Sequence, residues 1–469
     1  MASHEKKSAN VGLPEDANPL RARNFTTDPI DNIVFLYRTS PVRYPCCEAR
    51  REGAAAGGTT DMTQIENGWG AGPSSGYEAL AAPFRPVFAR IAAGAVEREN
   101  ERRLHFEEIG WLKEAGFGAV RLPRESGGGG ASLPELFALF IELSAADSNL
   151  TQALRAHFGF TEDVVSSRNE VHRQTWSARI AAGDIVGNAW SEIGDARQQT
   201  FSTRVEKNGD GWTLNGAKFY TTGSLFAEWI DVGASVDDGV SVGVIVARSS
   251  PGVAVVDDWD GFGQIGTASG TATFQDVVVE AQQIVADNDR FRYGQAFFQL
   301  VHLATLAGIG RAAASDLAAR VAARTRHYTN GAGPRSSQDP QVLQIVGRVR
   351  ASAYASGAVV LKAAEALQRA FDARLAGDEE AERLATNIAD IEAAQAQTVV
   401  TDLILEATTL VFDALGASAT RKDAALDRFW RNARTLSSHN PRIYKHRIIG
   451  DFAVNGTTHP DQWRIGLVA

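Results

Sequence analysis

WTLNGAKFYTTG, at residues 212–223, is the stretch that decides the fold of this chain. Its apolar and polar residues alternate, as in a β-strand with one buried face, and Asn215-Gly216 in its middle favours a tight hairpin turn. VSVGVIVAR at 240–248 and GTATFQDVVVE at 270–280 are further runs rich in Val and Thr, which favour strands. We therefore predict a β-domain over residues 184–288.

Helical periodicity flanks this β-domain on both sides. LPELFALFIELSAADSNLTQALRAHF (133–158) spaces its apolar residues by three and four, and Asp147 with Ser148 predicts a helix break and a new N-cap. RLATNIADIEAAQAQTVVTDLILEATTLVFDALG (383–416) repeats the spacing with a narrow apolar stripe, which predicts a bundle of long helices. The stripe consists of Leu384, Ile388, Ile391, Val399, Leu403 and Leu410. The order of helices, strands and helices differs from the alternation of a parallel α/β sheet.

Four segments follow from these patterns. Residues 1–61 mix Pro, Arg, Gly and Ala without a period and end just before the second methionine, Met62. We expect them to be a disordered or non-native leader, with a targeting or partner-binding tail as the alternative. Residues 62–183 are predicted to form an N-terminal helical domain, 184–288 the β-domain, and 289–469 a C-terminal helical bundle domain. The predicted fold class is mainly α with a central β-domain.

Composition excludes several classes of function. The formal net charge of −9 disfavours a nucleic-acid partner, which would need clustered basic residues. No run approaches the roughly 18–20 apolar residues of a membrane helix, and the first residues lack the apolar centre of a secretory signal, so we expect a cytoplasmic protein. The two cysteines, Cys46 and Cys47, are adjacent and fall within the predicted leader, which leaves no thiol chemistry for the remaining chain.

One motif suggests a nucleotide site that its context contradicts. GFGQIG at 261–266 satisfies G-x-G-x-x-G, but the dinucleotide fingerprint needs a strand before it and a helix after it. Here DDWD precedes the glycines and the strand-like TATFQDVVV follows, so we predict no Rossmann site. The nine histidines are scattered, and no metal site is predicted.

Three segments, taken in order, resemble the acyl-CoA dehydrogenase superfamily. VGNAWSEIGDA (186–196) is similar to its flavin-contacting strand and loop, and KFYTTG (218–223) to the segment beside the isoalloxazine ring. DGFGQIGTASGTATFQDVVV (260–279) is similar to its glycine-and-serine turn that leads into a strand. The resemblance runs from about residue 77 to 455. It implies an N-terminal helical domain, a β-barrel-like middle domain and a C-terminal four-helix bundle.

Within the superfamily, the chain is more similar to the two-component flavin-dependent monooxygenases typified by dibenzothiophene monooxygenase. FDALGASATR (412–421) and DRFWRNARTLSSHNPRIYK (427–445) are among the segments that carry this similarity. Many of the dehydrogenases keep a glutamate base late in the C-terminal domain, where this chain has His439 and no carboxylate until Asp451. The resemblance implies oxygenation of a small aromatic or organosulfur molecule, with amines as an option, by reduced FMN and O2 through a C4a-(hydro)peroxyflavin.

The resemblance also implies a site made of neutral hydrogen-bonding groups. Such groups, with water excluded, suit the handling of O2 by a reduced flavin better than a fixed carboxylate. An imidazole near its ordinary pKa can donate a proton at neutral pH. The candidate catalytic residues are His439, His157, Asn188 and Thr222. Each also has a purely structural interpretation, in a helix, at a strand end, in the flavin-contact segment or in a turn, and the sequence leaves both open.

Flavin contacts are implied on the same grounds. An arginine fork holds a phosphate well, so the cofactor-binding candidates combine ring contacts with arginines. They are Asn188, Trp190, Tyr220, Thr221, Thr222, Arg324, Arg326 and Arg421. FMN is favoured over FAD, which would also need room for adenine.

No nicotinamide site is visible, which implies a separate NAD(P)H:flavin reductase as a partner. The Ala-rich C-terminal helices are compatible with the homotetramer that the resemblance implies. The segments predicted to line the pocket carry few charges, which favours an uncharged substrate. An FAD-dependent acyl-CoA dehydrogenase or oxidase remains the enzymatic alternative, and a non-catalytic protein on the same fold is the second.

Overall fold

A computed structural model describes residues 68–192, 201–209, 211–236, 239–286 and 290–460. By internal contacts the chain divides into Met1–Asp61 and the compact unit Met62–Ala469, and only the second contains described residues. The predicted leader at 1–61, including Cys46 and Cys47, lies outside the described residues.

The first part of the unit is helical, as predicted. Its helices are α1 (Tyr77–Ala81), α2 (Arg85–Ala93), α3 (Ala95–Glu101), α4 (Phe106–Glu114), α5 (Leu133–Ala146), α6 (Ser148–Ala153), α7 (Arg155–Ser166) and α8 (Glu170–Ala181). A capping box between Ser132 and Glu135 starts α5, and most residues of this helix are buried. The side chain of Asp147 accepts a hydrogen bond from the backbone N–H of Asn149, which ends α5 and starts α6. The predicted break and N-cap at this point are confirmed.

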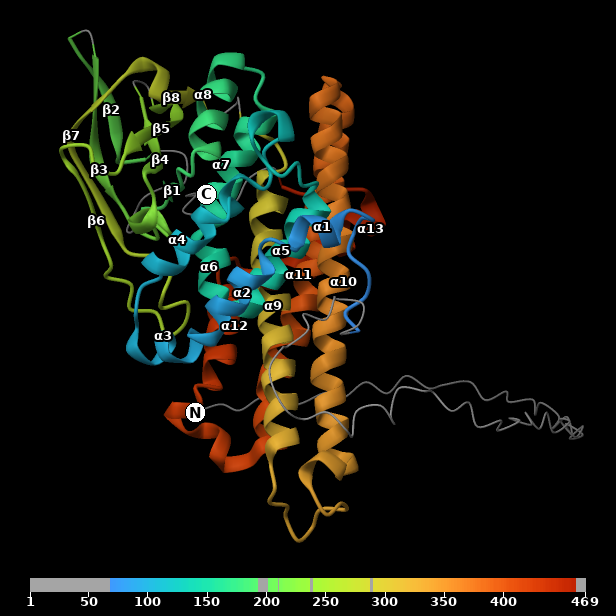
Figure 1. The fold of residues 1–469 in the computed structure, drawn as a ribbon. Coiled ribbons are helices and arrows are strands. Elements are labelled where there is room, and N and C mark those ends of the chain that lie inside the picture. The colour runs from blue at the N-terminus through green and yellow to red at the C-terminus, as the bar shows by residue number, and fades with distance from the viewer. Residues whose placement is uncertain (1–67, 193–200, 210, 237–238, 287–289, 461–469) are drawn as a thin grey trace, which may run out of the picture. The chain divides into compact units, whose positions relative to one another are not determined.

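Strands then form one mixed, eight-stranded sheet. They are β1 (Val186–Ala189), β2 (Arg204–Asn208), β3 (Gly211–Lys218), β4 (Trp229–Ser235), β5 (Ser241–Ala247), β6 (Val253–Val256), β7 (Thr271–Val279) and β8 (Ile284–Ala286). The order is β6-β7-β3-β2-β4-β5-β8, and β1 pairs with β4 in parallel. Valines of β5 and β7 contribute to a small apolar core of the sheet, separate from the larger core of the helices. Figure 1 shows the strands gathered beside α4, α7 and α8.

The hairpin prediction at Asn215-Gly216 is wrong. Both residues lie within β3, where the pairing with β7 shifts register between Leu214 and Gly216. Asn215 exchanges hydrogen bonds with Asp276 across this bulge, at 3.2 Å and 2.8 Å. The β2–β3 turn falls instead after Asn208, the residue that pairs with Gly211. An Asn-Gly pair suits a β-bulge as well as a turn, because both need unusual backbone angles.

Glycines of the GFGQIG segment allow close packing between elements. The segment lies between β6 and β7 and no helix follows it, which agrees with the prediction of no Rossmann site. A Cβ at Gly263 would overlap the carbonyl oxygen of Arg431, and one at Gly266 would overlap the ring of His105. The glycines therefore let this loop contact helices from both ends of the chain.

Long helices dominate the C-terminal part. They are α9 (Gly294–Ala323), α10 (Pro340–Ala376), α11 (Glu379–Leu415), α12 (Asp427–Ser437) and α13 (Lys445–Asn455). The helices α9, α10 and α11 pack on one another, and α5 packs on α9 (Figure 1). Among the described residues, α9 alone is long and apolar enough to cross a membrane, but 83% of its most apolar window is buried inside the protein. That burial is typical of a core helix.

The apolar stripe predicted on α11 faces two environments. Ile391 is buried, whereas the side chains of Leu384 and Val399 are 58% and 46% exposed. Alanines such as Ala393 and Ala407 supply much of the buried face. Periodicity identified the helix correctly but did not distinguish its core face from an exposed apolar face. The mainly helical fold with a central sheet is confirmed, while the domain boundaries 62–183, 184–288 and 289–469 stay predictions.

Candidate functional site

The loop after β3 lies directly against the junction of α6 and α7. Gly223 has a φ of +80°, and a Cβ there would overlap the carbonyl oxygen of Ala153 at the end of α6. Its backbone N–H donates to the carbonyl of Thr267 at 3.0 Å. Only glycine satisfies this backbone angle and this contact together. The contact brings the Thr221-Thr222-Gly223 segment beside the helices.

Asn188 and Tyr220 meet at this loop. The Asn188 side chain donates to the carbonyl oxygen of Tyr220 at 3.4 Å, and the hydroxyl of Ser224 donates to the carbonyl of Asn188 at 2.7 Å. Tyr220 is 50% exposed and has a φ of +60°, which is uncommon for a bulky residue. Strained backbone of this kind gathers at functional sites, where surrounding contacts maintain it. The exposed ring and its backbone angle agree with a ligand contact, and that role of Tyr220 stays a prediction.

Thr221 and Thr222 use their hydroxyls to hold the neighbouring loop. Thr222 Oγ1 shares a 2.7 Å hydrogen bond with Ser269 Oγ, and Thr221 Oγ1 donates to the carbonyl of Gly270 at 2.9 Å. Ser269 Oγ also shares a 2.7 Å hydrogen bond with the hydroxyl of Thr267. Both threonines are buried. A ligand of the Thr222 hydroxyl would have to share it with Ser269.

Trp190 is engaged inside the β-domain. Its indole N–H donates to Asp231 at 3.1 Å, and the guanidinium of Arg290 lies 4.8 Å from its ring centre. Arg290 also bridges Asp231 and Asp163 at 2.8 Å and 2.7 Å. These contacts give Trp190 a structural role, and no described contact joins it to Tyr220.

His157 is buried, and backbone groups occupy both of its ring nitrogens. Nε2 lies 2.9 Å from the carbonyl oxygen of Gly118, and Nδ1 accepts from the backbone N–H of Val186 at 3.2 Å. Because Nδ1 is an acceptor, the proton resides on Nε2 and the ring is neutral. Burial lowers its pKa to about 4. His157 thus joins α7 to β1, and neither nitrogen is left for a proton transfer.

His439 follows the end of α12 and is exposed to solvent. Its ring centre lies 4.2 Å from that of His302 on α9, and its Nδ1 lies 3.2 Å from Oδ1 of Asn440. Burial by the surrounding protein and the charge of Arg155 lower its pKa to about 4, although its exposure moderates the first effect. His439 is therefore neutral at pH 7.

Two residues of this region were missed from the sequence. His302 is 1% exposed, and neither ring nitrogen has a hydrogen-bond partner among the described residues. Arg155 starts α7, its buried Nε lacks a partner, and its guanidinium lies 5.1 Å from the ring centre of Phe298. His302 stands in the apolar run QLVHLATLAG, and a lone polar residue in such a run is the signal that could have identified it.

The arginines predicted to bind phosphate lie elsewhere. Arg324 donates to the carbonyls of Ala414 and Leu415 at the end of α11, at 3.4 Å and 3.0 Å. Arg421 forms an exposed ion pair with Asp423, and Arg326 is exposed. Arg324 follows His302 by 22 positions, or about 33 Å at the rise of an α-helix. Within the described chain Arg324 and Arg421 are thus engaged by other partners, and the phosphate-binding role of these arginines stays a prediction.

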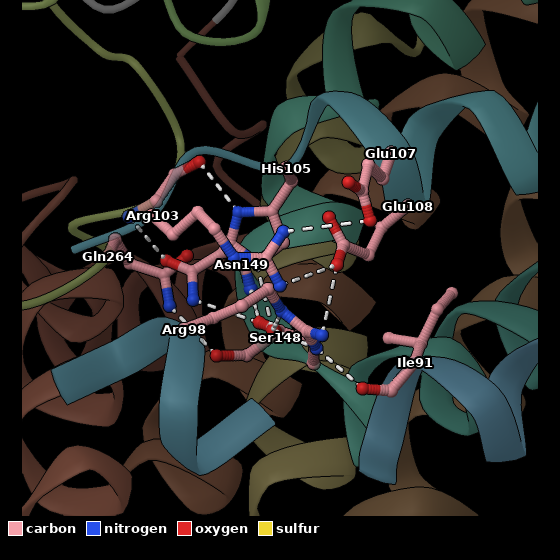
Figure 2. Close-up of polar contacts among 11 residues, drawn as sticks. Ile91, Arg98, Arg103, His105, Glu107, Glu108, Ser148, Asn149 and Gln264 are labelled. Atoms are coloured by element: carbon pink, nitrogen blue, oxygen red, sulfur yellow. Dashed lines mark hydrogen bonds and ion pairs between the residues drawn. The ribbon is translucent and has the colours of Figure 1, made fainter. Parts of the chain in front are cut away.

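A buried polar network fixes α6 beside this site. Asp147 accepts from Arg98 at 3.0 Å and from His105 at 2.8 Å, and Arg98 also pairs with Glu108 at 3.1 Å. Figure 2 shows the side chains of Arg98 and Glu108 directed toward each other. Burial opposes ionisation of Asp147, but His105 and Arg98 hold its pKa well below the ordinary value. Burial likewise opposes charging of His105, yet Asp147 raises its pKa.

The same network extends to the loop between β6 and β7. Gln264 donates from its amide to the Ser148 hydroxyl at 3.0 Å, and its backbone N–H donates to Asn432 on α12 at 2.5 Å. Asn149 accepts from the backbone N–H of Gly266 at 3.2 Å (Figure 2). Helices from both ends of the chain thus hold the loop that positions Thr222.

Comparison with known proteins places this arrangement in a family. Residues 78–184 match the acyl-CoA dehydrogenase N-terminal domain, and residues 300–441 match the acyl-CoA dehydrogenase C-terminal domain. Dibenzothiophene monooxygenase of Rhodococcus erythropolis is 30% identical over 396 residues, which cover 79% of this chain and 92% of that protein. A probable FMNH2-dependent monooxygenase of Pseudomonas putida, SfnC, is 26% identical over 79% of this chain and 93% of its own length. The chain belongs to the acyl-CoA dehydrogenase family, in its flavin-dependent monooxygenase branch.

Solved structures agree on the fold. TdsC from Paenibacillus sp. A11-2, in complex with FMN and indole, has a TM-score of 0.74 at 24% identity, covering 82% of this chain and 99% of TdsC. The methanesulfinate monooxygenase MsuC from Pseudomonas fluorescens has a TM-score of 0.75 at 24% identity, covering 81% and 98%. The acyl-CoA dehydrogenase-like fold expected from the sequence is thereby confirmed.

Proposed function

We propose that the chain is a two-component monooxygenase that inserts one atom of O2 into a small aromatic or organosulfur molecule. One observation carries the proposal: the group that follows α12 is a neutral imidazole, His439, with no carboxylate beside it among the described residues. Desaturation of an acyl thioester needs a carboxylate base, and Asp451 instead accepts from Asn455 on α13 at 2.6 Å. The dehydrogenase or oxidase alternative and the non-catalytic alternative therefore rank below oxygenation.

The flavin is FMN, and the residues present fit its ring. Asn188 offers an amide whose one side-chain hydrogen bond among the described residues is long, at 3.4 Å, and Tyr220 offers an exposed aromatic face. Bound reduced FMN would supply the electrons that activate O2. Asn188, Thr222 and Tyr220 would hold and orient the ring, while the packing of Gly223 on Ala153 would limit water at its edge.

Neighbouring residues fix the tautomer of His439. Gln299 Oε1 accepts from the amide nitrogen of Asn440 at 2.6 Å, so Asn440 Oδ1 faces Nδ1 of His439. This assignment follows from the hydrogen-bond network. Nδ1 then carries the proton and donates it to Asn440, which leaves the Nε2 lone pair free. His439 would accept a proton or hydrogen bond at Nε2, rather than donate as the sequence suggested.

Assembly and partners extend the proposal. Exposed apolar side chains on α10 and α11, such as Tyr354 and Leu384, support a homotetramer formed through these helices. Arg324, Arg326 and Arg421 would then hold the FMN phosphate of a neighbouring subunit. A separate NAD(P)H:flavin reductase would supply reduced FMN, and we place the protein in the cytoplasm. Light scattering at several protein concentrations tests the tetramer, and a monomer would contradict this assembly.

The test of the reaction uses anaerobic protein mixed with FMNH2 and then with 18O2 in the presence of indole or dibenzothiophene. We expect FMNH2 to oxidise more slowly than free FMNH2 and one 18O atom to enter the product. Oxidation at the rate of free FMNH2, without label in any product, would refute oxygenation. Bleaching of a bound FAD by acyl-CoA would favour the dehydrogenase alternative instead.

A further inference from the structure

Arg155 is a half-buried cation without a counter-charge among the described residues. Buried arginines are nearly always paired, and Arg98, Arg121 and Arg374 each pair with a buried carboxylate in this chain. Arg155 forms no hydrogen bond or ion pair with any described residue, and its Nε is buried without a partner. Its one described partner is the ring of Phe298. Within the described part of the chain, the hydrogen-bonding capacity of the guanidinium is therefore unused.

The position of Arg155 is that of a ligand-facing group. It lies two residues after Ala153, which contacts the Thr222-Gly223 loop, and its side chain is only half-buried. Phe298 packs on Gly159 of α7, which brings α9 against α7 beside Arg155. His302 lies one helical turn beyond Phe298, and its ring contacts that of His439, so Arg155 and the two imidazoles lie on the same side of α9.

The charge beside Arg155, His302 and His439 is positive, and no described carboxylate neutralises it. Burial lowers the pKa of Arg155 to about 10, and no carboxylate acts against that shift, so the guanidinium is charged at neutral pH. Burial, His439 and Arg155 hold the pKa of His302 well below its ordinary value. The buried nitrogens of His302 add a second set of unmatched polar atoms on the same side of α9. An oxyanion between these groups would accept hydrogen bonds from the guanidinium and from the one protonated nitrogen of His302.

We propose that the substrate of this chain carries an acid group, a carboxylate, sulfinate or sulfonate, that pairs with Arg155 while its reacting atom faces His439. This rests on the monooxygenase function proposed above. A planar guanidinium fork matches two oxygens of such a group, and Phe298 provides an apolar surface for the rest of the molecule. The sequence favoured an uncharged substrate because Arg155 lies outside the segments taken as pocket-lining.

The FMN phosphate is the other oxyanion that could reach this cation, and we assign Arg155 to the substrate. His302 and His439 are the titratable groups beside it, and they belong to the reacting end of the site. The phosphate, at the far end of the ribityl chain, is instead the ligand proposed for Arg324, Arg326 and Arg421.

Equilibrium binding to the full-length protein tests the assignment without turnover. Benzoate and benzenesulfinate are compared with the neutral benzamide and thioanisole by calorimetry, for wild type, Arg155→Met and the exposed control Arg383→Met. We expect Arg155→Met to weaken the two anions about 10- to 100-fold, the range of a charge-assisted hydrogen bond, and to leave the neutral probes within twofold. Arg383→Met should change neither.

The thermal stability of Arg155→Met provides a second test of the assignment. Removing a charge that has no counter-charge should offset the lost contact with the ring of Phe298, so the melting temperature of Arg155→Met should stay close to that of wild type. A clear loss of stability would show that Arg155 has a protein partner and would overturn the assignment.

Three binding results would also overturn it: no binding of either anion at millimolar concentration, equal binding of anions and neutral probes by wild type, or anion binding that survives in Arg155→Met. Titration with FMN and riboflavin separates the two oxyanions. If Arg155→Met weakens FMN but not riboflavin, the phosphate is the ligand and the substrate assignment fails. Failure of the 18O2 experiment, with anion binding intact, would refute oxygenation but not the anion site.

Discussion

Asp147→Asn should destabilise the protein strongly, because it removes the one carboxylate that, among the described residues, contacts both Arg98 and His105. The change keeps the shape of the side chain and the Oδ1 that caps α6, and it removes both the charge and the hydrogen bonds that Oδ2 accepts from Arg98 and His105. Breaking one partner of a buried ion pair typically costs about 3–5 kcal/mol. Arg98 retains Glu108 at 3.1 Å, so we expect the lower end, about 3 kcal/mol of unfolding free energy.

The effect should depend on pH in a defined direction. The pKa of Asp147 is lowered by folding, so its contribution is complete above its unfolded pKa of about 3.9 and is lost as the pH falls below that value. The pKa of His105 is raised by folding, so its contribution is complete below about 6.5 and is lost as the pH rises through the folded pKa. The difference between wild type and variant should therefore be greatest between about pH 4 and 6.5.

Urea unfolding followed by circular dichroism, at pH 5, 7 and 9, measures this difference from the transition midpoints. Glu380→Gln is the matched control, since it removes the carboxylate of an exposed pair with Arg383 on α11 and should leave the midpoint unchanged. A loss below about 1 kcal/mol at pH 5, or a loss that is larger at pH 9 than at pH 5, would refute the reasoning about this network.

Further predictions concern the site. Gly223→Ala should weaken FMN binding at least tenfold and lower the melting temperature, because alanine fits neither the φ nor the contact at that position. Titration with FMN and a melting curve measure these two effects. An FMN affinity within twofold of wild type would contradict the prediction. Since folding lowers the pKa of His157 to about 4, stability should fall by about 3 kcal/mol between pH 6.5 and 4, and His157→Gln should flatten this part of the urea profile. Gln299→Leu should lower kcat about tenfold and shift its pH profile by releasing Asn440 from His439, with the Kd for FMN unchanged. An unshifted profile would show that the tautomer of His439 is set in another way.

Patterns of local origin were predicted well from the sequence. The succession of helices, strands and helices follows from periodicities of 3.6 and 2, and the Asp147 cap from the preference of its side chain for a free backbone N–H. Asn215-Gly216 failed because its partner, Asp276, lies 61 positions away, and that pairing makes a bulge rather than a turn. The exposure of Leu384 could not be predicted for a similar reason. The spacing of apolar residues identifies one face of a helix but not the element that packs on that face.

Prediction of the site was uneven on physical grounds. Asn188, Tyr220 and Thr222 lie together because one short loop and one strand hold them, so short motifs were sufficient. The ring nitrogens of His157 bond to backbone groups of Gly118 and Val186, which lie far away in sequence, and no local pattern shows that they are engaged. Arg155 differs from the other buried arginines because no described carboxylate lies beside it. The sequence does not show which side chains surround an arginine in the folded chain, so this difference could not be predicted.

The loop between β6 and β7 has a consequence for how the protein folds. Its bonds to His105 and Asn432 join residues 161 and 168 positions apart, among the longest separations in the described chain. Closing such large loops is entropically unfavourable until the elements at both ends exist. The binding site should therefore be the last region to become native after dilution from denaturant, and the first to open when the protein is warmed. Flavin binding during refolding would then report the completion of the fold, later than any signal from the helices or the sheet alone.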